Sequence, residues 1–113
     1  MSKHWAFDLM GRVWPRFGCW SFVQHACEIR HGVAMPELSS MDAIRSTWMP
    51  RAGTPREDDI VSMRGPKGRH AGVMTFANGR LGVLHADETV AFETLDDLRR
   101  SGYGTFVFWS RAT

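Results

Sequence analysis

The chain has 113 residues, and 14 Lys and Arg against 12 Asp and Glu give a formal net charge of +2. This length favours a single domain that spans residues 1–113. A charge this close to neutral does not call for a nucleic acid or an acidic membrane as partner. Hydrophobic residues make up 43% and charged residues 23% of the chain, a composition typical of globular domains and not of disordered segments.

The sequence predicts neither a signal peptide nor a membrane span. Its first residues lack the apolar stretch of a secretory signal. The longest apolar run, Phe106 to Trp109, is far shorter than the ~20 residues of a membrane-spanning helix.

The first half of the chain predicts helices. Between Gly18 and His31, apolar residues recur at helical spacing on one face, and Gly32 follows as a stop signal. A second, shorter helix is predicted from Ser39, an N-cap candidate, to Trp48, with Met49-Pro50 ending it. Residues 51–58 are then expected to form a polar connector.

The second half predicts strands and one short helix. Five short segments change to the alternating pattern of strands, at 60–63, 70–76, 81–86, 90–92 and 103–109. A capped helix is predicted from Thr94 to about Arg100. Helices followed by antiparallel strands are typical of the α+β fold class.

The dipeptide Asn78-Gly79 is a strong signal for a tight hairpin. With these two residues as the turn, Gly72 faces His85 and His70 faces Asp87. All four then lie on one face of the sheet, and the two histidines are diagonal neighbours at ~7–8 Å between Cα atoms. The hairpin therefore predicts two imidazoles close together with a carboxylate beside them.

Cys19 and Cys27 are expected to be free thiols. They lie eight residues apart in one predicted helix, which separates them by about 12 Å at ~1.5 Å rise per residue, too far for a disulfide. Cys19 opens the helix, where unpaired backbone N–H groups and the helix dipole lower a thiol pKa. Cys27 fits better as a small core residue.

Together these residues predict a nucleophilic site. Cys19 would be the nucleophile, His70 its base and His85 the group that orients the base. The competing interpretation places Cys19 in the core and the histidines in half-buried strand positions. A zinc site of His25 and Cys27-x3-His31 is disfavoured because no second closely spaced pair accompanies it, so no metal or cofactor is expected.

Two further residues are candidates for substrate contact. Trp20 follows Cys19 directly and lies off the main apolar face, so it either lines a substrate cleft or packs in the core. Asp87 falls beside the predicted histidine pair.

Five segments, in the same order, resemble the NlpC/P60 cysteine peptidases, most closely the phage tail-assembly branch. The segment ending in Gly18-Cys19-Trp20 looks like the nucleophile loop and helix start, and Arg69–Met74 looks like the strand with the catalytic base. The match extends over nearly the whole chain, through the segments Arg12–Val23, His31–Pro36, Asp59–Met63, Arg69–Met74 and Leu81–Ala86.

The resemblance implies a compact papain-like domain with N-terminal helices packed on an antiparallel sheet. It implies a hydrolase that cleaves amide bonds in peptidoglycan stem peptides through Cys19, His70 and His85, without a metal. It further implies assembly in a host cytoplasm into a virion, at the phage tail tip and beside other tail-tip proteins, where such a domain opens the cell wall.

Two alternatives remain open. Gly18 stands where the family usually has Asp, and Glu57-Asp58-Asp59 stands where it usually has Pro-Gly-Asp. These departures favour a catalytically weak or inactive structural component of a tail tip that keeps the fold for interactions. The same catalytic residues would also serve a related thiol enzyme, such as an acyltransferase or a toxin amidase.

Overall fold

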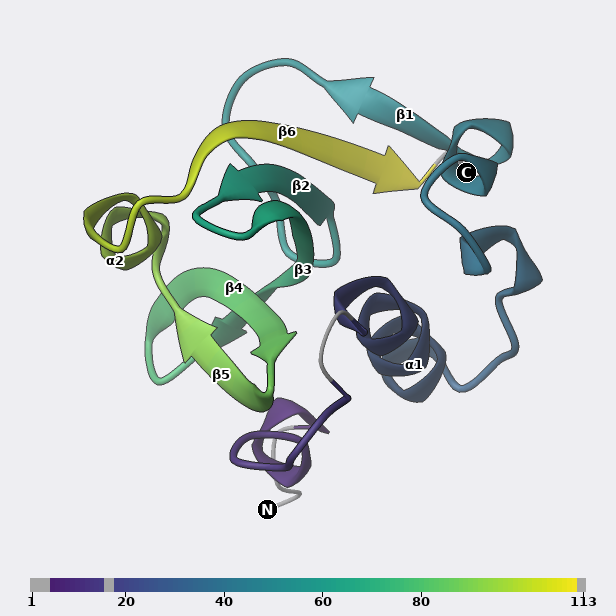
Figure 1. Ribbon diagram of the computed structural model, residues 1–113. Coiled ribbons are helices and arrows are strands. Elements are labelled where there is room, and N and C mark those ends of the chain that lie inside the picture. The colour runs from purple at the N-terminus through teal and green to yellow at the C-terminus, as the bar shows by residue number, and fades with distance from the viewer. Residues whose placement is uncertain (1–4, 16–17, 112–113) are drawn as a thin grey trace.

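The computed structural model describes residues 5–15 and 18–111, so Arg16 and Phe17 of the loop before Cys19 lie outside the described residues. Figure 1 shows the arrangement of the elements. The helical segments are η1 (Trp5–Asp8), α1 (Cys19–His31), η2 (Pro36–Leu38), η3 (Ala43–Ser46) and α2 (Leu95–Arg100). The strands are β1 (Trp48–Arg51), β2 (Ile60–Gly65), β3 (Gly68–Ala77), β4 (Arg80–Asp87), β5 (Thr89–Glu93) and β6 (Gly104–Arg111).

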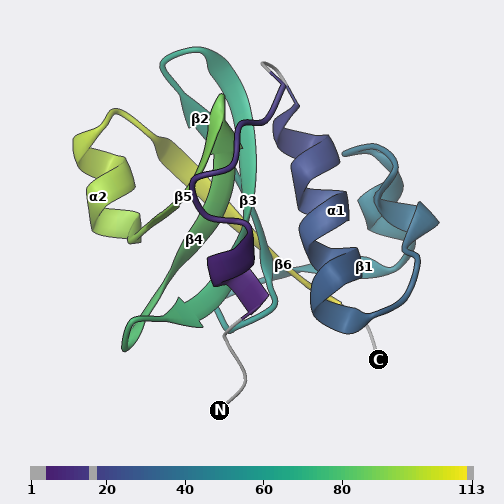
Figure 2. The ribbon, with the colours of Figure 1, turned by 90° about the horizontal axis from the view of Figure 1, so that it is seen from below.

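All six strands form one sheet in the order β1-β6-β2-β3-β4-β5, and every pairing is antiparallel. Figure 2 shows α1 on one face of this sheet and α2 on the other. The predicted α+β class is therefore confirmed, with an antiparallel sheet as expected. Within the described residues, no helix is both long and apolar enough to cross a membrane.

Alternating residues of the strands divide the core between the two faces of the sheet. Ala71 and Val73 of β3 pack with the buried side of α1 in the larger cluster. Met74 of the same strand belongs to a smaller cluster around Leu98 of α2. Since side chains alternate along a strand, His70 shares the α2 face with Met74. The sheet thus separates α1 from the face that carries the histidines.

The predicted helix at 18–31 is confirmed as α1. Phe22, Val23, Ala26 and Cys27 form its buried face. The helix ends at Gly32, whose φ of 72° is left-handed and whose N–H donates to the Glu28 carbonyl. Such a cap favours glycine because the left-handed region costs other residues free energy.

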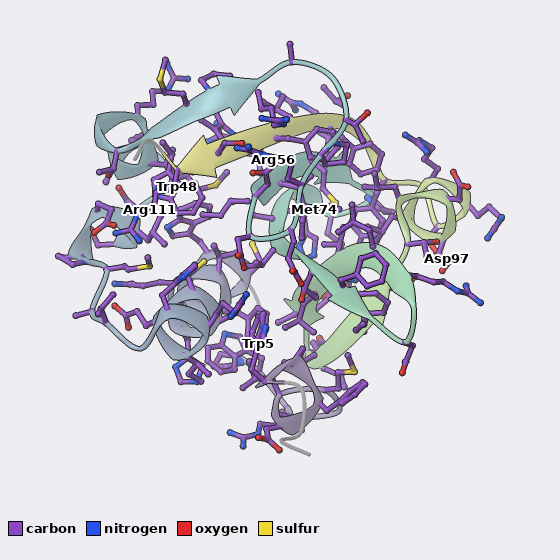
Figure 3. The ribbon with its side chains drawn as sticks, turned by 180° about the vertical axis from the view of Figure 1, so that it is seen from behind. Trp5, Trp48, Arg56, Met74, Asp97 and Arg111 are labelled. Atoms are coloured by element: carbon purple, nitrogen blue, oxygen red, sulfur yellow. The ribbon has the colours of Figure 1, made fainter. Side chains whose placement is uncertain are left out.

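The predicted second helix is wrong. Its region holds only the short 3₁₀ segment η3, and Trp48 begins an edge strand, β1, that pairs with the C-terminal β6. Trp48 lies opposite Arg111, as the view in Figure 3 shows. Burial of the Trp48 ring against the core and pairing with a strand distant in sequence outweigh the local helical pattern. Pro50 is tolerated because β1 is an edge strand.

The hairpin register is confirmed. Ala77 pairs with Arg80 around the turn at Asn78 and Gly79, and Gly72 pairs with His85. Asn78 and Gly79 have φ values of 53° and 75°, as a tight hairpin turn requires. His70 and His85 therefore project from the same face of neighbouring strands.

Candidate functional site

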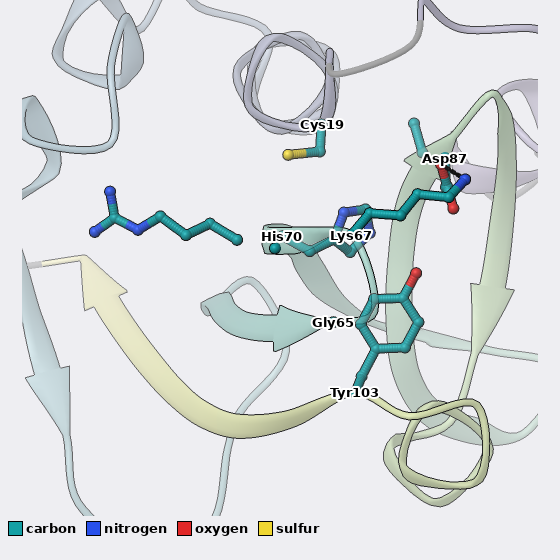
Figure 4. Close-up of a pocket in the computed structure, with 9 residues that line it drawn as sticks. Cys19, Gly65, Lys67, His70, Asp87 and Tyr103 are labelled. Carbon is teal, nitrogen blue, oxygen red and sulfur yellow. Dashed lines mark ion pairs between the residues drawn. The ribbon is translucent and has the colours of Figure 1, made fainter.

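A small pocket of about 50 Å³ lies where β3 begins and β4 ends. Cys19, His70, Asp87 and Tyr103 line it together with Lys67, and Figure 4 shows that these residues come from several elements. Lys67, Asp87 and Tyr103 also line a wider adjoining groove of about 360 Å³. The structure thus brings Cys19, His70 and Asp87, three of the residues singled out from the sequence, to one pocket.

Cys19 is the first residue of α1, and Trp14 holds Gly18, the residue before it, in place. The Trp14 indole N–H donates to the Gly18 carbonyl at 2.9 Å, and the Trp14 backbone N–H donates to the Glu88 carbonyl at 3.0 Å. The Ser21 hydroxyl also donates to the Gly18 carbonyl, at 2.9 Å. A Cβ on Gly18 would lie 2.8 Å from the Pro15 carbonyl oxygen. This close approach explains why a glycine precedes the cysteine.

His70 and His85 form a buried hydrogen-bonded pair. His70 Nε2 lies 2.9 Å from His85 Nδ1, and the two rings meet edge to face. Gly72 leaves room for this arrangement, because a Cβ there would lie 2.4 Å from Val83 Cγ1 and 3.1 Å from His85 Cβ. The two imidazoles that the hairpin pattern predicts to be neighbours are in direct contact.

Glu93 extends this pair, and reasoning from the sequence missed it. Its Oε1 lies 2.9 Å from His85 Nε2. Glu93 pairs with Val83 and Ala91 pairs with His85, so Glu93 is the diagonal neighbour of His85 on the same face. The feature that could have identified Glu93 is the turn around Glu88, where Asp87 pairs with Thr89.

Burial keeps both imidazoles neutral at pH 7. Desolvation lowers the pKa of His70 to about 4, and the neighbouring His85 acts in the same direction. Desolvation also lowers the pKa of His85, although the hydrogen bond and charge of Glu93 oppose this shift. A neutral imidazole can accept a proton, which a base must do.

The thiol of Cys19 differs from the expectation. Burial raises its pKa, and the negative charge of Asp87 adds to this effect. Hydrogen bonds from the backbone at Ala71, Trp20 and Cys19 itself act in the opposite direction but do not outweigh burial. The expected lowering at the helix start is therefore wrong in direction, because a dry environment disfavours a thiolate.

Cys19 and the histidines reach the pocket from opposite faces of the sheet. Cys19 belongs to α1, whereas His70 and His85 lie on the α2 face. Figure 4 shows Cys19 on one side of β3 and Tyr103 on the other, with His70 between them. Among the hydrogen bonds of the described residues, none joins Cys19 to His70. The two groups share the pocket where β3 begins and β4 ends, without a hydrogen bond between thiol and imidazole.

Tyr103 closes the histidine pair on the α2 side. Its ring centroid lies 5.3 Å from that of His70 and 6.3 Å from that of His85. Gly65 permits this position, since a Cβ there would lie 2.4 Å from Tyr103 Cε1. Tyr103 shields the imidazoles from water and contributes to the desolvation that lowers their pKa.

The two proposed substrate contacts have different positions. Asp87 borders the pocket, where its Oδ1 lies 3.6 Å from Lys67 Nζ. Trp20 lies in a separate hollow with Arg45 and Trp109, and its indole N–H donates to the Leu38 carbonyl at 2.6 Å. Among the described residues, no group of three or more His, Cys, Asp or Glu side chains is arranged to hold a metal ion.

Comparison with protein-family models, with curated proteins and with solved structures finds no match to this chain.

Proposed function

We propose that this protein is a cysteine peptidase or amidase with a papain-like NlpC/P60 fold that cleaves amide bonds in peptidoglycan stem peptides. The contact that carries the proposal is the 2.9 Å hydrogen bond between His70 and His85, because His70 lines the same pocket as Cys19. A thiol, a neutral base and a group that orients the base are the three components of nucleophilic amide cleavage.

His70 Nε2 is engaged by His85, so Nδ1 is the ring nitrogen left to act as base. In the first step, His70 Nδ1 takes the Cys19 proton while the sulfur bonds to the substrate carbonyl carbon. The C–N bond then breaks, and the leaving amine takes the proton from His70, which leaves a thioester on Cys19. Water attacks this thioester with His70 again as base, which releases the acid and the free thiol.

The start of α1 supports charge stabilisation in this reaction. The first backbone N–H groups of a helix have no partner within it, so the N–H of Cys19 can donate to the developing oxyanion. In the family that the sequence resembles, an Asp before the cysteine helps to order this turn. Here Trp14 holds the turn through its bond to the Gly18 carbonyl, and the space beside Gly18 has no room for a side chain.

The expected setting is a phage tail tip. Assembly with other virion proteins in the host cytoplasm would place the domain against the cell wall. The wide groove beside the pocket, lined by Lys67, Asp87 and Tyr103, is where a charged stem peptide would lie.

Removal of the nucleophile tests the proposal. Wild-type protein is expected to release stem-peptide fragments from purified peptidoglycan, and Cys19→Ala to release none above background. Cys27→Ala is the matched control, because Cys27 is buried on the core face of the same helix, away from the pocket. Equal release by the wild type and Cys19→Ala, measured by mass spectrometry, would exclude Cys19 as nucleophile.

One observation favours a second function, that of a catalytically weak structural component of the tail tip. Burial raises the pKa of Cys19, and no hydrogen bond within the described residues joins this thiol to His70. A protein that keeps the fold only for interactions needs no activated thiol.

The pH dependence of thiol alkylation distinguishes a Cys19 thiolate paired with protonated His70 from a site in which both groups are neutral. In Cys27→Ala, which leaves Cys19 as the only thiol, we expect the midpoint of the alkylation rate to lie above pH 9.0, the ordinary value for cysteine, because burial raises the pKa of Cys19. A midpoint several pH units lower would show a thiolate paired with protonated His70. That result would contradict the neutral site and would exclude the inert alternative.

A further inference from the structure

Glu93 is the third member of a continuous hydrogen-bonded row. His70 Nε2 lies 2.9 Å from His85 Nδ1, and His85 Nε2 lies 2.9 Å from Glu93 Oε1. The row begins at the thiol pocket and ends at the wide groove, which Glu93 lines. Both histidines are almost fully buried, so water cannot replace these partners.

The row has a direction because a carboxylate accepts hydrogen bonds and does not donate them. The hydrogen between Glu93 and His85 must therefore be on His85 Nε2. A neutral imidazole carries one hydrogen, so His85 Nδ1 is an acceptor, and the hydrogen between the rings is on His70 Nε2. His70 Nδ1 is then left with a lone pair.

We propose that Glu93 is a positioning residue that fixes the tautomers of His85 and His70, so that His70 presents an unprotonated Nδ1 to the pocket shared with Cys19. The inference deepens the proposed hydrolase function and rests on it for its catalytic meaning. Glu93 acts through His85, two hydrogen bonds away from the nitrogen whose state it determines.

The opposite direction of the row would disable the base. With hydrogens on His85 Nδ1 and His70 Nδ1, the nitrogen available to the thiol would already carry a proton. The contact between the two rings alone does not fix the direction, because each ring can donate or accept at either nitrogen. The choice depends on the group at the end of the row, which is Glu93.

Other charged groups near the row do not replace Glu93. Asp87 of β4 and Lys67 of the β2–β3 turn form an ion pair across the pocket mouth, with Lys67 Nζ 3.6 Å from Asp87 Oδ1. The ring of Tyr103, just before β6, packs on both imidazoles. Cys19 of α1 and Arg69 of β3 complete the charged and titratable groups around the pocket. Glu93 is the one carboxylate of the described residues that is hydrogen-bonded to either ring.

The test is nitrogen NMR of the histidine rings at neutral pH, in wild type and in Glu93→Gln. In wild type we expect the long-range ¹H–¹⁵N pattern of a neutral ring protonated at Nε2 for both His70 and His85. A glutamine keeps the size of Glu93 but can donate as well as accept, so Glu93→Gln should populate His70 protonated at Nδ1. Asp96→Asn, which removes an exposed carboxylate on α2, is the charge-matched control and should leave both patterns unchanged.

The proposal would be overturned by a wild-type His70 protonated at Nδ1, or by unchanged tautomers in a folded Glu93→Gln. The wild-type spectrum decides the first point even where the variant does not fold. These spectra need no substrate, so they test the role of Glu93 whether or not the protein hydrolyses peptidoglycan. If it does, kcat in Glu93→Gln should fall by about 100-fold with little change in KM, as expected for a base in the wrong tautomer.

Discussion

Replacement of His70 with glutamine is expected to lower kcat/KM for the cleavage of peptidoglycan amide bonds by about 10³-fold at pH 7, within the range that a positioned acid–base group contributes. Glutamine can still bond to His85 and fills much of the same space, but its amide cannot accept the thiol proton. The effect should be large here because burial raises the pKa of Cys19, so little thiolate exists without a base.

His31→Gln is the control variant that separates a loss of catalysis from a loss of stability. His31 ends α1, at the opposite end of the helix from Cys19, and lies in a different pocket. It should retain wild-type kcat/KM, while both variants give wild-type circular dichroism. If His70→Gln kept more than a tenth of the wild-type rate, His70 would not be the base, and the structural alternative would gain support.

The histidine pair was predictable from the sequence because its geometry depends on a local signal. Asn78-Gly79 specifies a two-residue turn, the turn fixes the register, and the register places His70 and His85 on one face. The helix α2 was predictable for a similar reason. Thr94 and Asp97 form a reciprocal capping box, which acts over three residues and is visible as a sequence pattern.

Features that depend on contacts between distant segments were not predictable. Trp48 pairs with Arg111 in β1 and β6, and nothing near Trp48 in the sequence indicates that partner. Glu93 escaped notice because the turn around Glu88 has no strong dipeptide signal, although Glu88 has a φ of 65°. The alternation of side chains across that turn would have placed Glu93 beside His85.

The pKa of Cys19 was also not predictable, because it too depends on contacts with distant segments. The position of Cys19 at the start of a helix was visible in the sequence, and the backbone hydrogen bonds there do lower the thiol pKa. How deeply the sulfur is buried depends on segments that lie far along the chain, and so does the negative charge of Asp87 that acts on it. A sequence thus indicates which nearby dipoles act on a group but not how much water surrounds it.

Acidification from pH 7 to pH 4 is expected to cost the fold about 3 kcal/mol through His70, at ~1.36 kcal/mol for each pKa unit between 6.5 in the unfolded chain and about 4 in the folded protein. Below pH 6.5 the unfolded chain binds a proton at His70 that the folded protein does not. The free energy of unfolding therefore falls as the pH decreases from 6.5 towards 4. His85 adds to this loss, because burial lowers its pKa as well.

Urea denaturation at several pH values between 7 and 4.5 measures this loss as a decrease in the free energy of unfolding. The same series on His70→Gln separates His70 from the carboxylates, which begin to titrate at the acid end in both proteins. The variant has no imidazole at this position to protonate, so its free energy of unfolding should decrease less steeply than that of the wild type as the pH falls. Parallel curves would mean that His70 is protonated as easily in the folded protein as in the unfolded chain. Tyr103→Ala tests whether burial is what keeps the His70 ring neutral. Exposing the two rings to water should raise the pKa of His70. The free energy of unfolding of this variant should therefore depend less steeply on pH than that of the wild type.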